Sequence, residues 1–151
     1  MKKKILTIFF LLLLNACGFK PIYNTDNSKE FSLEILSIEG DIEINNYIKR
    51  NLKFYINSFY KKKFTLKIVS NYEKNILTKN KLGQATDYEL IVQTNFEINS
   101  GKNNRIIELT KKFNIKDLED SFQEKEYERI IKNNLVNIIT NDLINKISLM
   151  E

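Results

Sequence analysis

The sequence contains no histidine, one cysteine, one proline and four glycines in 151 residues. Without histidine the chain cannot build a histidine-based catalytic triad, a histidine proton shuttle or a histidine metal site. Two of the glycines, Gly18 and Gly40, lie at segment edges, and nothing in the chain resembles a phosphate-cradling loop. We therefore expect no histidine-based catalysis, no nucleotide chemistry, and no bound cofactor or metal.

The remaining composition is that of one folded domain. Hydrophobic residues make up 42% of the chain and charged residues 28%, a balance typical of globular proteins and not of disordered ones. A chain of this length has room for one adequate core and little room for a second.

The first 16 residues are built like a secretory signal. Lys2, Lys3 and Lys4 form a positive segment, and residues 5–14 are apolar except for Thr7. These ten residues would cover about 15 Å as a helix, half of the roughly 30 Å that a membrane-spanning helix needs. We expect residues 1–16 to be a signal peptide that is removed on export.

The only cysteine follows this run directly. Residues 14–17, Leu-Asn-Ala-Cys, resemble the lipobox of bacterial lipoproteins, although Asn15 stands where that group usually has a small or hydroxyl residue. The resemblance implies cleavage between Ala16 and Cys17, a diacylglycerol on the thiol, and a fatty acid such as palmitate on the new amino group. Each buried CH₂ contributes about 0.8 kcal/mol, so three acyl chains would hold the chain on a membrane for good. The alternative, a buried core thiol, leaves the lysine-rich start unexplained.

Gly18 occupies the position after the cysteine where, in enteric bacteria, an aspartate keeps lipoproteins at the inner membrane. By that resemblance the chain is lipid-anchored at the periplasmic face of the outer membrane. Its net charge of +5 first suggests an anionic partner, but removal of Lys2, Lys3 and Lys4 leaves 21 basic and 19 acidic residues, a net charge of +2. We therefore expect no nucleic-acid partner.

The mature chain divides into a lipidated N-terminal tether, residues 17–30, and a domain, residues 31–151. Apolar residues alternate over residues 31–38, which predicts a strand that ends at Gly40. Asp41 is a candidate helix cap, and apolar residues recur every three or four positions from Ile44 to Phe59, as on one face of a helix. Residues 61–63, Lys-Lys-Lys, follow the end of this helix, where cations complement the helix dipole.

Three further strands and a second helix follow. Alternation predicts strands over residues 64–72, 88–98 and 107–115, with a loop or turn at 75–84 and a hairpin turn at 99–104. Asp120 or Ser121 caps the last helix, whose apolar stripe comprises Tyr127, Ile131, Leu135, Ile138 or Ile139, Leu143 and Ile147. The order β-α-β-β-β-α predicts an α+β single domain: one four-stranded sheet, polar on one face, with two helices packed on the other.

Carboxylates are concentrated in residues 117–128, "DLEDSFQEKEYE". Such a cluster could bind a divalent cation or supply a general acid and base. Lysine is interspersed among them, and most fall within the first turns of the predicted helix, where the dipole favours acidic side chains. We interpret the segment as a charged helix start.

Three short motifs and the predicted order resemble the LPS-assembly lipoprotein family, LptE, in its alphaproteobacterial form. Members of that group commonly begin the mature chain as this one does at residues 17–23, "CGFKPIY". Their first helix often carries an Arg-Asn pair in an aliphatic frame, matched by "IKRNL" at residues 48–52, and "YEL" at residues 88–90 opens a strand as the family's segments do. The resemblance spans essentially the whole chain, and the N-terminal heptapeptide is its most specific part.

The resemblance implies a non-enzymatic protein with three kinds of partner: an LptD-like outer-membrane β-barrel, lipopolysaccharide, and the membrane through its acyl chains. Such a protein assists assembly of the barrel, plugs its lumen and helps deliver lipopolysaccharide to the outer leaflet. Basic residues are candidate contacts for anionic lipid A phosphates, or are simply solvated charges: Lys20, Arg50, Lys61, Lys62, Lys63 and Arg105. The alternatives are a generic outer-membrane lipoprotein that acts as an envelope scaffold, or a small-ligand module with an apolar pocket.

Overall fold

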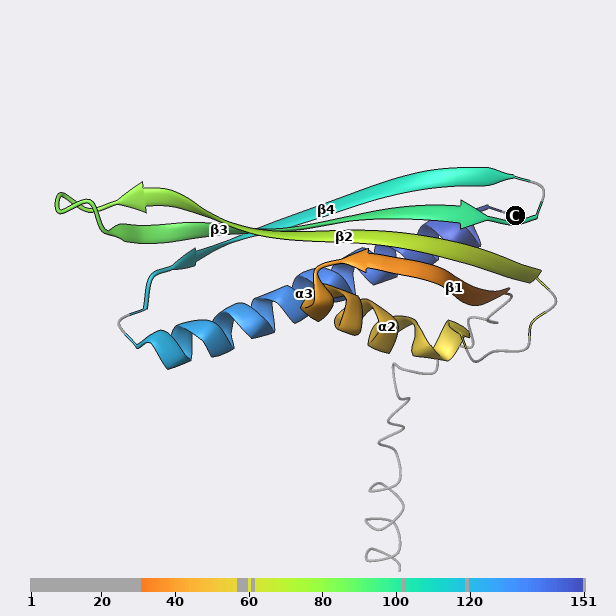
Figure 1. Ribbon diagram of the computed structural model, residues 1–151, viewed down its shortest axis with the longest axis horizontal. Helices are drawn as coiled ribbons and strands as arrows, with labels where there is room; N and C mark the ends of the chain where they lie inside the picture. Colours follow the sequence, from red (N-terminus) through yellow and green to blue (C-terminus); the bar gives the residue numbers. More distant parts are fainter. Residues whose placement is uncertain (1–30, 57–59, 61, 102, 119, 151) are drawn as a thin grey trace, which may run out of the picture.

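The computed structural model describes residues 31–56, 60, 62–101, 103–118 and 120–150. The elements are β1 (Phe31–Gly40), α2 (Ile42–Ile56), β2 (Lys62–Lys79), β3 (Ala85–Asn99), β4 (Asn104–Lys116) and α3 (Ser121–Ser148). Both helices lie on one side of the four-stranded sheet (Figure 1). This confirms the predicted α+β fold, its element order and the placement of its helices. The predictions for the signal peptide, the cleavage site and the tether lie outside the described residues.

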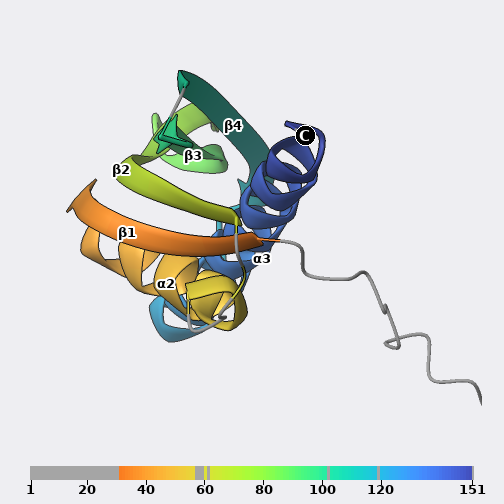
Figure 2. The same cartoon turned by 90° about the vertical axis from the view of Figure 1, so that its right-hand side faces the viewer.

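The four strands lie in the order β1-β2-β3-β4. β1 and β2 are parallel and are connected by α2, whereas β2, β3 and β4 form antiparallel hairpins. A parallel pair needs a crossover connection of this kind, which the helix provides. Figure 2 shows that the sheet curves around α3, with β1 beside α2 at one edge and β4 beside α3 at the other.

One apolar layer fills the space between the sheet and the helices. The predicted alternation is correct in β2 and β3, whose inward side chains from Phe64 to Ser70 and from Leu90 to Ile98 are buried. The two helices contribute Ile44, Ile48 and Leu52 from α2, and Ile131, Leu135, Val136, Ile139, Leu143 and Ile147 from α3. The sequence left open whether Ile138 or Ile139 belongs to the apolar stripe of the last helix. Ile139 is buried and Ile138 is exposed. The prediction for Tyr127 was wrong: it is exposed, because α3 has no buried residue before Ile131.

Both predicted helix caps are aspartates. The Asp41 carboxylate accepts a hydrogen bond from the backbone N–H of Ile44 at 2.9 Å, as predicted. Asp120, and not Ser121, caps α3, because its carboxylate accepts from the N–H groups of Phe122 and Gln123. These bonds satisfy backbone donors that a helix start otherwise leaves without partners.

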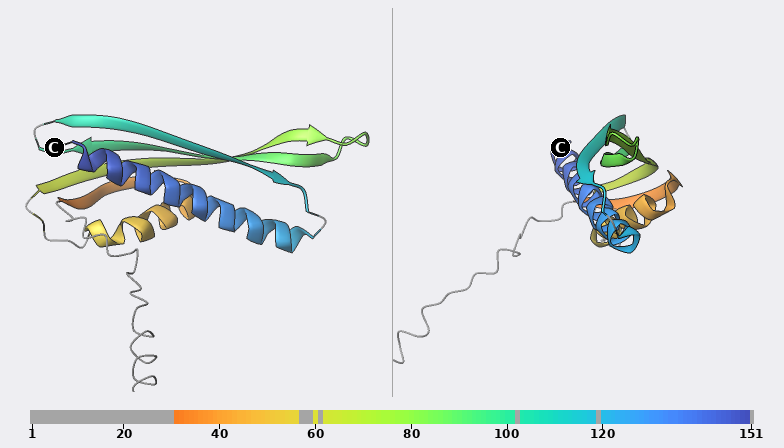
Figure 3. Two further views of the ribbon diagram at one scale, coloured as in Figure 1. Left: turned by 180° about the vertical axis from the view of Figure 1, so that it is seen from behind. Right: turned by 90° about the vertical axis from the view of Figure 1, so that its left-hand side faces the viewer.

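The first half of the predicted loop at residues 75–84 is strand. β2 continues to Lys79, and only residues 80–84 form the turn, in which the Asn80 side chain accepts hydrogen bonds from the N–H groups of Leu82 and Gln84. Ile76 and Leu77 are consecutive and exposed, so these residues lack the alternation of a half-buried strand. Backbone pairing with β3 extends the strand there regardless of side-chain pattern. The resulting β2–β3 hairpin reaches past the start of α3 (Figure 3).

The predicted position of the lysine run after α2 also needs correction. The helix is described from Ile42 to Ile56, with Lys53 in its last turn. Lys62 and Lys63 are the first residues of β2, paired with Phe31 and Ser32 of β1. They therefore belong to the end of the sheet and not to the helix terminus. Phe59 and Lys61 lie outside the described residues.

Gly40 allows the chain to turn from β1 into α2. Its φ is +97°, and a Cβ built on it would lie 1.8 Å from the carbonyl oxygen of Ser70 on β2. The Asp41 N–H donates to that same carbonyl at 3.2 Å, so the backbones must approach closely here. Only glycine meets both the conformational and the steric requirement.

We expect Gly40→Ala to lower the free energy of unfolding by at least about 2 kcal/mol, because it adds a backbone clash to an unfavourable φ. Gly83→Ala is the matched control: its φ is +81°, but a Cβ added there would meet no atom within 4 Å. It should cost only about 1 kcal/mol. Urea unfolding followed by circular dichroism measures both, and equal losses would contradict the role assigned to the Ser70 contact.

Candidate functional site

The basic residues predicted to meet anionic groups do not form one site. Lys20 and Lys61, like Ala16 and Cys17, lie outside the described residues. Arg50 lies on α2, where its guanidinium donates to Asn133 of α3 at 2.7 Å and lies 4.9 Å from the centre of the Tyr47 ring. Its described contacts hold the two helices together, which is a structural role.

The neighbouring Asn51 completes this connection between the helices. Its amide donates to Asn137 at 2.7 Å and to the Thr140 hydroxyl at 3.2 Å, both on α3. Hydrogen-bonded polar side chains between partly buried helices fix their relative register. The Arg-Asn pair in "IKRNL" thus has a structural explanation that requires no ligand.

Lys62, Lys63 and Arg105 lie together at one end of the sheet. Lys62 and Lys63 begin β2, and Arg105 is the second residue of β4, next to the β3–β4 turn. Lys63 forms an ion pair with Glu34 at 2.8 Å, and the Lys62 ammonium lies 5.4 Å from the centre of the Phe64 ring. Arg105 is exposed and has no ion-pair partner among the described residues.

Arg105 borders a depression of about 420 Å³ at this end. Its lining comprises Arg105, Ile106 and Ile107 of β4, together with Lys146, Leu149 and Met150 at the end of α3. We call these six residues the end patch. A smaller cavity of about 30 Å³ beside it is lined by Phe64, Ile98 and Met150 among others, so the C-terminal end of α3 meets the ends of β2 and β3 here.

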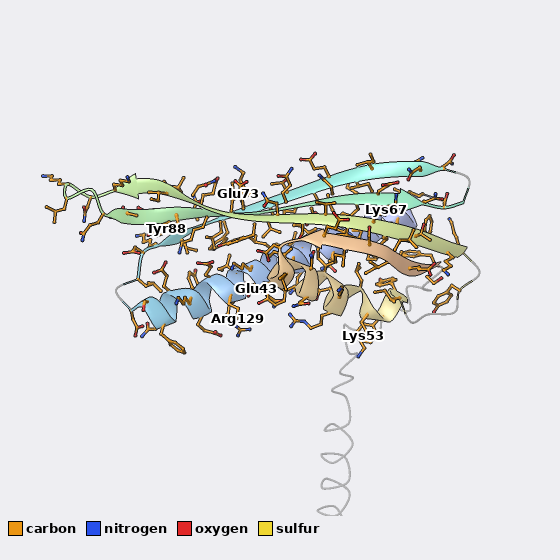
Figure 4. The ribbon with its side chains drawn as sticks, viewed as in Figure 1. Glu43, Lys53, Lys67, Glu73, Tyr88 and Arg129 are labelled. Atoms are coloured by element: carbon orange, nitrogen blue, oxygen red, sulfur yellow. The ribbon has the colours of Figure 1, made fainter. Side chains whose placement is uncertain are left out.

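The sheet face that points away from the helices carries mainly polar side chains, with Val69 and Ile106 exposed among them. Its charged side chains pair across neighbouring strands: Lys67 lies 3.3 Å from Glu97, and Lys112 lies 3.1 Å from Glu89. Gln93 likewise donates to Glu108 at 2.7 Å. Lys67 and Glu73 are labelled in Figure 4. Because the charges are paired, this face is strongly hydrated without carrying a large field of one sign.

The carboxylate segment at residues 117–128 is a charged helix start, in which three glutamates have basic partners. Lys74 of β2 lies 2.5 Å from Glu124 and 3.1 Å from Glu128, and Arg129 lies 2.6 Å from Glu126. No group of three or more acidic or cysteine side chains is placed to hold a metal ion within the ranges that the structure describes.

Glu128 is the centre of a network that joins α3 to α2 and the sheet. Its carboxylate accepts a hydrogen bond from the Tyr72 hydroxyl at 2.7 Å and lies 3.1 Å from both Lys74 and Lys132. Lys132 also pairs with Glu43 of α2 at 2.9 Å. Figure 4 shows Glu43 between the two helices. The two lysines also cover aromatic faces, with Lys74 4.3 Å from the Tyr88 ring and Lys132 4.1 Å from that of Tyr72.

The network shifts the protonation equilibria of its members. Burial disfavours the charged form of Glu128, but hydrogen bonds from Tyr72, Lys74 and Lys132 outweigh this and hold its pKa below the ordinary value. Burial likewise opposes the charge of Lys132, and hydrogen bonds to Glu43 and Glu128 nevertheless raise its pKa. Burial and the bond to Glu128 both raise the pKa of Tyr72. All three groups thus keep their neutral-pH charge states.

Sequence reasoning missed this network, although part of it was visible. Glu124, Glu128 and Lys132 are spaced by four, so they lie on one face of α3. Nothing in the local sequence signals that Lys74 reaches the same face, because it lies at the edge of the stretch predicted to be a loop. The sequence signal for the network was therefore incomplete.

In the part of the chain that the structure describes, no helix is long and apolar enough to cross a membrane.

Known proteins resemble the chain in fold. Rare lipoprotein B from Shewanella oneidensis matches with a TM-score of 0.57 at 14% sequence identity, covering 76% of this chain and 94% of that one. A minor lipoprotein from Acinetobacter baumannii matches at 0.55 and 16%, covering 79% and 93%. Lipoprotein B from Nitrosomonas europaea matches at 0.52 and 18%, covering 80% and 85%.

No protein-family model and no curated protein matches the sequence. At identities this low the structural likeness establishes a shared fold. The similar structures named above are all lipoproteins.

We expect Glu128→Gln to lower the free energy of unfolding by about 1–2 kcal/mol at pH 7, because it weakens the partly buried bonds to Lys74 and Lys132. The pKa of Glu128 is lower in the folded chain than its ordinary value of 4.5. Its stabilisation is therefore present above that value and is lost as the pH falls through the folded pKa. The difference between wild type and variant should shrink as the pH falls below 4.5.

Glu126→Gln is the matched control, because Glu126 pairs with Arg129 on the exposed side of the same helix. Exposed pairs contribute little, so this variant should unfold almost as the wild type does. Urea unfolding at a series of pH values measures all three chains. Equal destabilisation by the two variants would show that the network does not join the helix to the sheet.

Proposed function

We propose that the chain is an outer-membrane lipoprotein, anchored through Cys17, that assists assembly of an LptD-like β-barrel, plugs its lumen and helps deliver lipopolysaccharide to the outer leaflet. The N-terminal sequence "CGFKPIY" carries this proposal, since it combines a lipobox cysteine with the most specific segment of the LPS-assembly lipoprotein resemblance. The fold shared with three solved lipoproteins supports it.

The outer sheet face supports the part of the proposal that concerns the barrel. Large outer-membrane barrels have polar, hydrated interiors. A face of paired charges such as Lys67–Glu97 and Lys112–Glu89 stays hydrated and carries little net charge. It could lie against such a wall without burying an unpaired charge.

Lipopolysaccharide phosphates would be met by basic side chains. Lys62, Lys63 and Arg105 lie at the same end of the sheet. Arg105 is the favoured candidate, because Lys63 is already paired with Glu34 and Arg105 has no ion-pair partner among the described residues. Arg50 is less suited, since its guanidinium is used between the helices. Lys20 and Lys61 remain candidates outside the described residues.

A pull-down from native membranes in mild detergent, using a C-terminally tagged chain, tests the proposal by mass spectrometry of its partners and its N-terminal peptide. We expect the wild-type chain to carry an acylated Cys17 and to recover a very large outer-membrane barrel. The Cys17→Ser variant should carry no acyl chains and should recover the barrel inefficiently. An acylated Cys17 without a barrel would contradict the translocon role and leave a scaffold lipoprotein. An unmodified, uncut chain would contradict the anchor itself.

The face that meets the barrel can be tested separately with a photo-cross-linking amino acid. Asn95 is exposed on the outer face of β3, and Asn141 is exposed on α3. They are a matched pair of the same residue type on opposite sides of the domain. We expect cross-links to the barrel from position 95 and few from position 141, and the reverse result would contradict the role assigned to the sheet face.

A further inference from the structure

We propose that the end patch is a membrane-contact surface that binds the headgroup region of a bilayer containing anionic phospholipid. The inference rests on the proposed lipid anchor at Cys17. It goes beyond that anchor, because it assigns to the folded domain a second contact with the same bilayer.

The end patch combines exposed apolar and unpaired basic side chains. Ile106 is 77% exposed and Leu149 is 84% exposed, and both border the depression of about 420 Å³. Arg105 and Lys146 flank them and have no ion-pair partner among the described residues. Apolar tips beside basic heads suit an interface where acyl chains meet anionic headgroups.

Acidic side chains near the patch that the structure describes are already engaged. Asp142 on α3 forms an ion pair with Lys111 at 2.8 Å. Glu97 on β3 accepts hydrogen bonds from Lys67 and Asn104. Among the described residues at this end, the charges without an ion-pair partner are therefore those of Arg105 and Lys146, which complement an anionic bilayer surface.

The patch lies at the end of the domain to which the anchor leads. Phe31, the first residue of β1, pairs with Lys62 at the start of β2, and its ring contacts that of Phe64. Phe64, Arg105 and Met150 line one small cavity, so the start of β1 and the end patch share this end of the sheet (Figure 1). The 14 residues from Cys17 to Glu30 can span at most about 50 Å, so a bilayer that holds Cys17 is within reach of the patch.

The opposite end provides a matched control. The tip of the β2–β3 hairpin carries Leu82, which is 84% exposed, as Leu149 is. β2 has 18 residues and is about 55 Å long at about 3.3 Å per residue, so the two leucines lie far apart. Leu149 and Leu82 therefore do not differ in exposure. They should differ in lipid contact if the anchored end of the domain lies against a bilayer.

The absence of tryptophan from the sequence allows a direct test. Leu149→Trp and Leu82→Trp each introduce a single tryptophan into the full chain, which is purified from membranes and reconstituted into phosphatidylcholine and phosphatidylglycerol vesicles with brominated acyl chains. We expect emission from position 149 to be blue-shifted and quenched at least about twofold, and emission from position 82 to be unchanged. Adding Arg105→Glu and Lys146→Glu, or salt at about 1 M, should reduce the quenching at position 149.

Equal quenching at both positions, or none at position 149, would overturn the proposal. A blue shift at position 149 without quenching would overturn it too, because a second copy or another segment of the chain would then cover the patch. Mass measurement of the N-terminal peptide reports the anchor independently. If Cys17 carries no lipid, the comparison of positions 149 and 82 still decides the role of the patch, with the chain added to the vesicles from solution. These vesicles contain no lipopolysaccharide, so the result is separate from that part of the proposed function.

Discussion

The fold depends on burying one face of a long, curved sheet beneath only two helices. The hydrophobic residues of β2 and β3 are sandwiched against α2 and α3, and those at the centre, such as Leu66, Phe96 and Ile139, are fully buried. Removal of this much apolar surface from water is the main source of stability in a domain of this size. Where the helices end, burial ends, and the sheet continues as a hairpin whose outer residues are exposed.

The polar network around Glu128 lies at the edge of that apolar layer, beside the first turns of α3. The first turns of α3 carry no buried residue, so ion pairs and the Tyr72 hydroxyl connect them to the sheet. Such contacts are directional, and they hold a helix in register where apolar contacts would allow it to slide. They are also weaker in water than the core contacts. The first turns of α3 are therefore held mainly by polar contacts, whereas the helix from Ile131 onward is packed in the apolar core.

The element order, both caps and the inward faces of β2 and β3 could be predicted because each has a local cause: a period of two or of three to four, or an aspartate before a helix. The extension of β2 to Lys79 could not, because β3 supplies that pairing from residues close to the turn. Lys62 and Lys63 were assigned to a helix end, since charge alone does not distinguish a helix terminus from the start of a strand. The end patch joins β4 to the last residues of α3, far apart in sequence, so no local pattern indicates it. For the same reason the sequence could not indicate that Arg50 donates a hydrogen bond to Asn133 on α3.

Parallel pairing of β1 with β2 has a mechanical consequence. Tension on the chain before Phe31 would act along β1, and the strand would have to slide past β2 as a unit. The hydrogen bonds over the paired stretch from Phe31 to Gly40 would then bear the load together, and would not open one after another as in peeling. The stacking of Phe31 on Tyr55 and its edge contact with Phe64 add resistance at the point where the pull enters. If the proposed anchor holds the domain through its first strand, this pairing would resist unfolding of the domain under tension from the anchor.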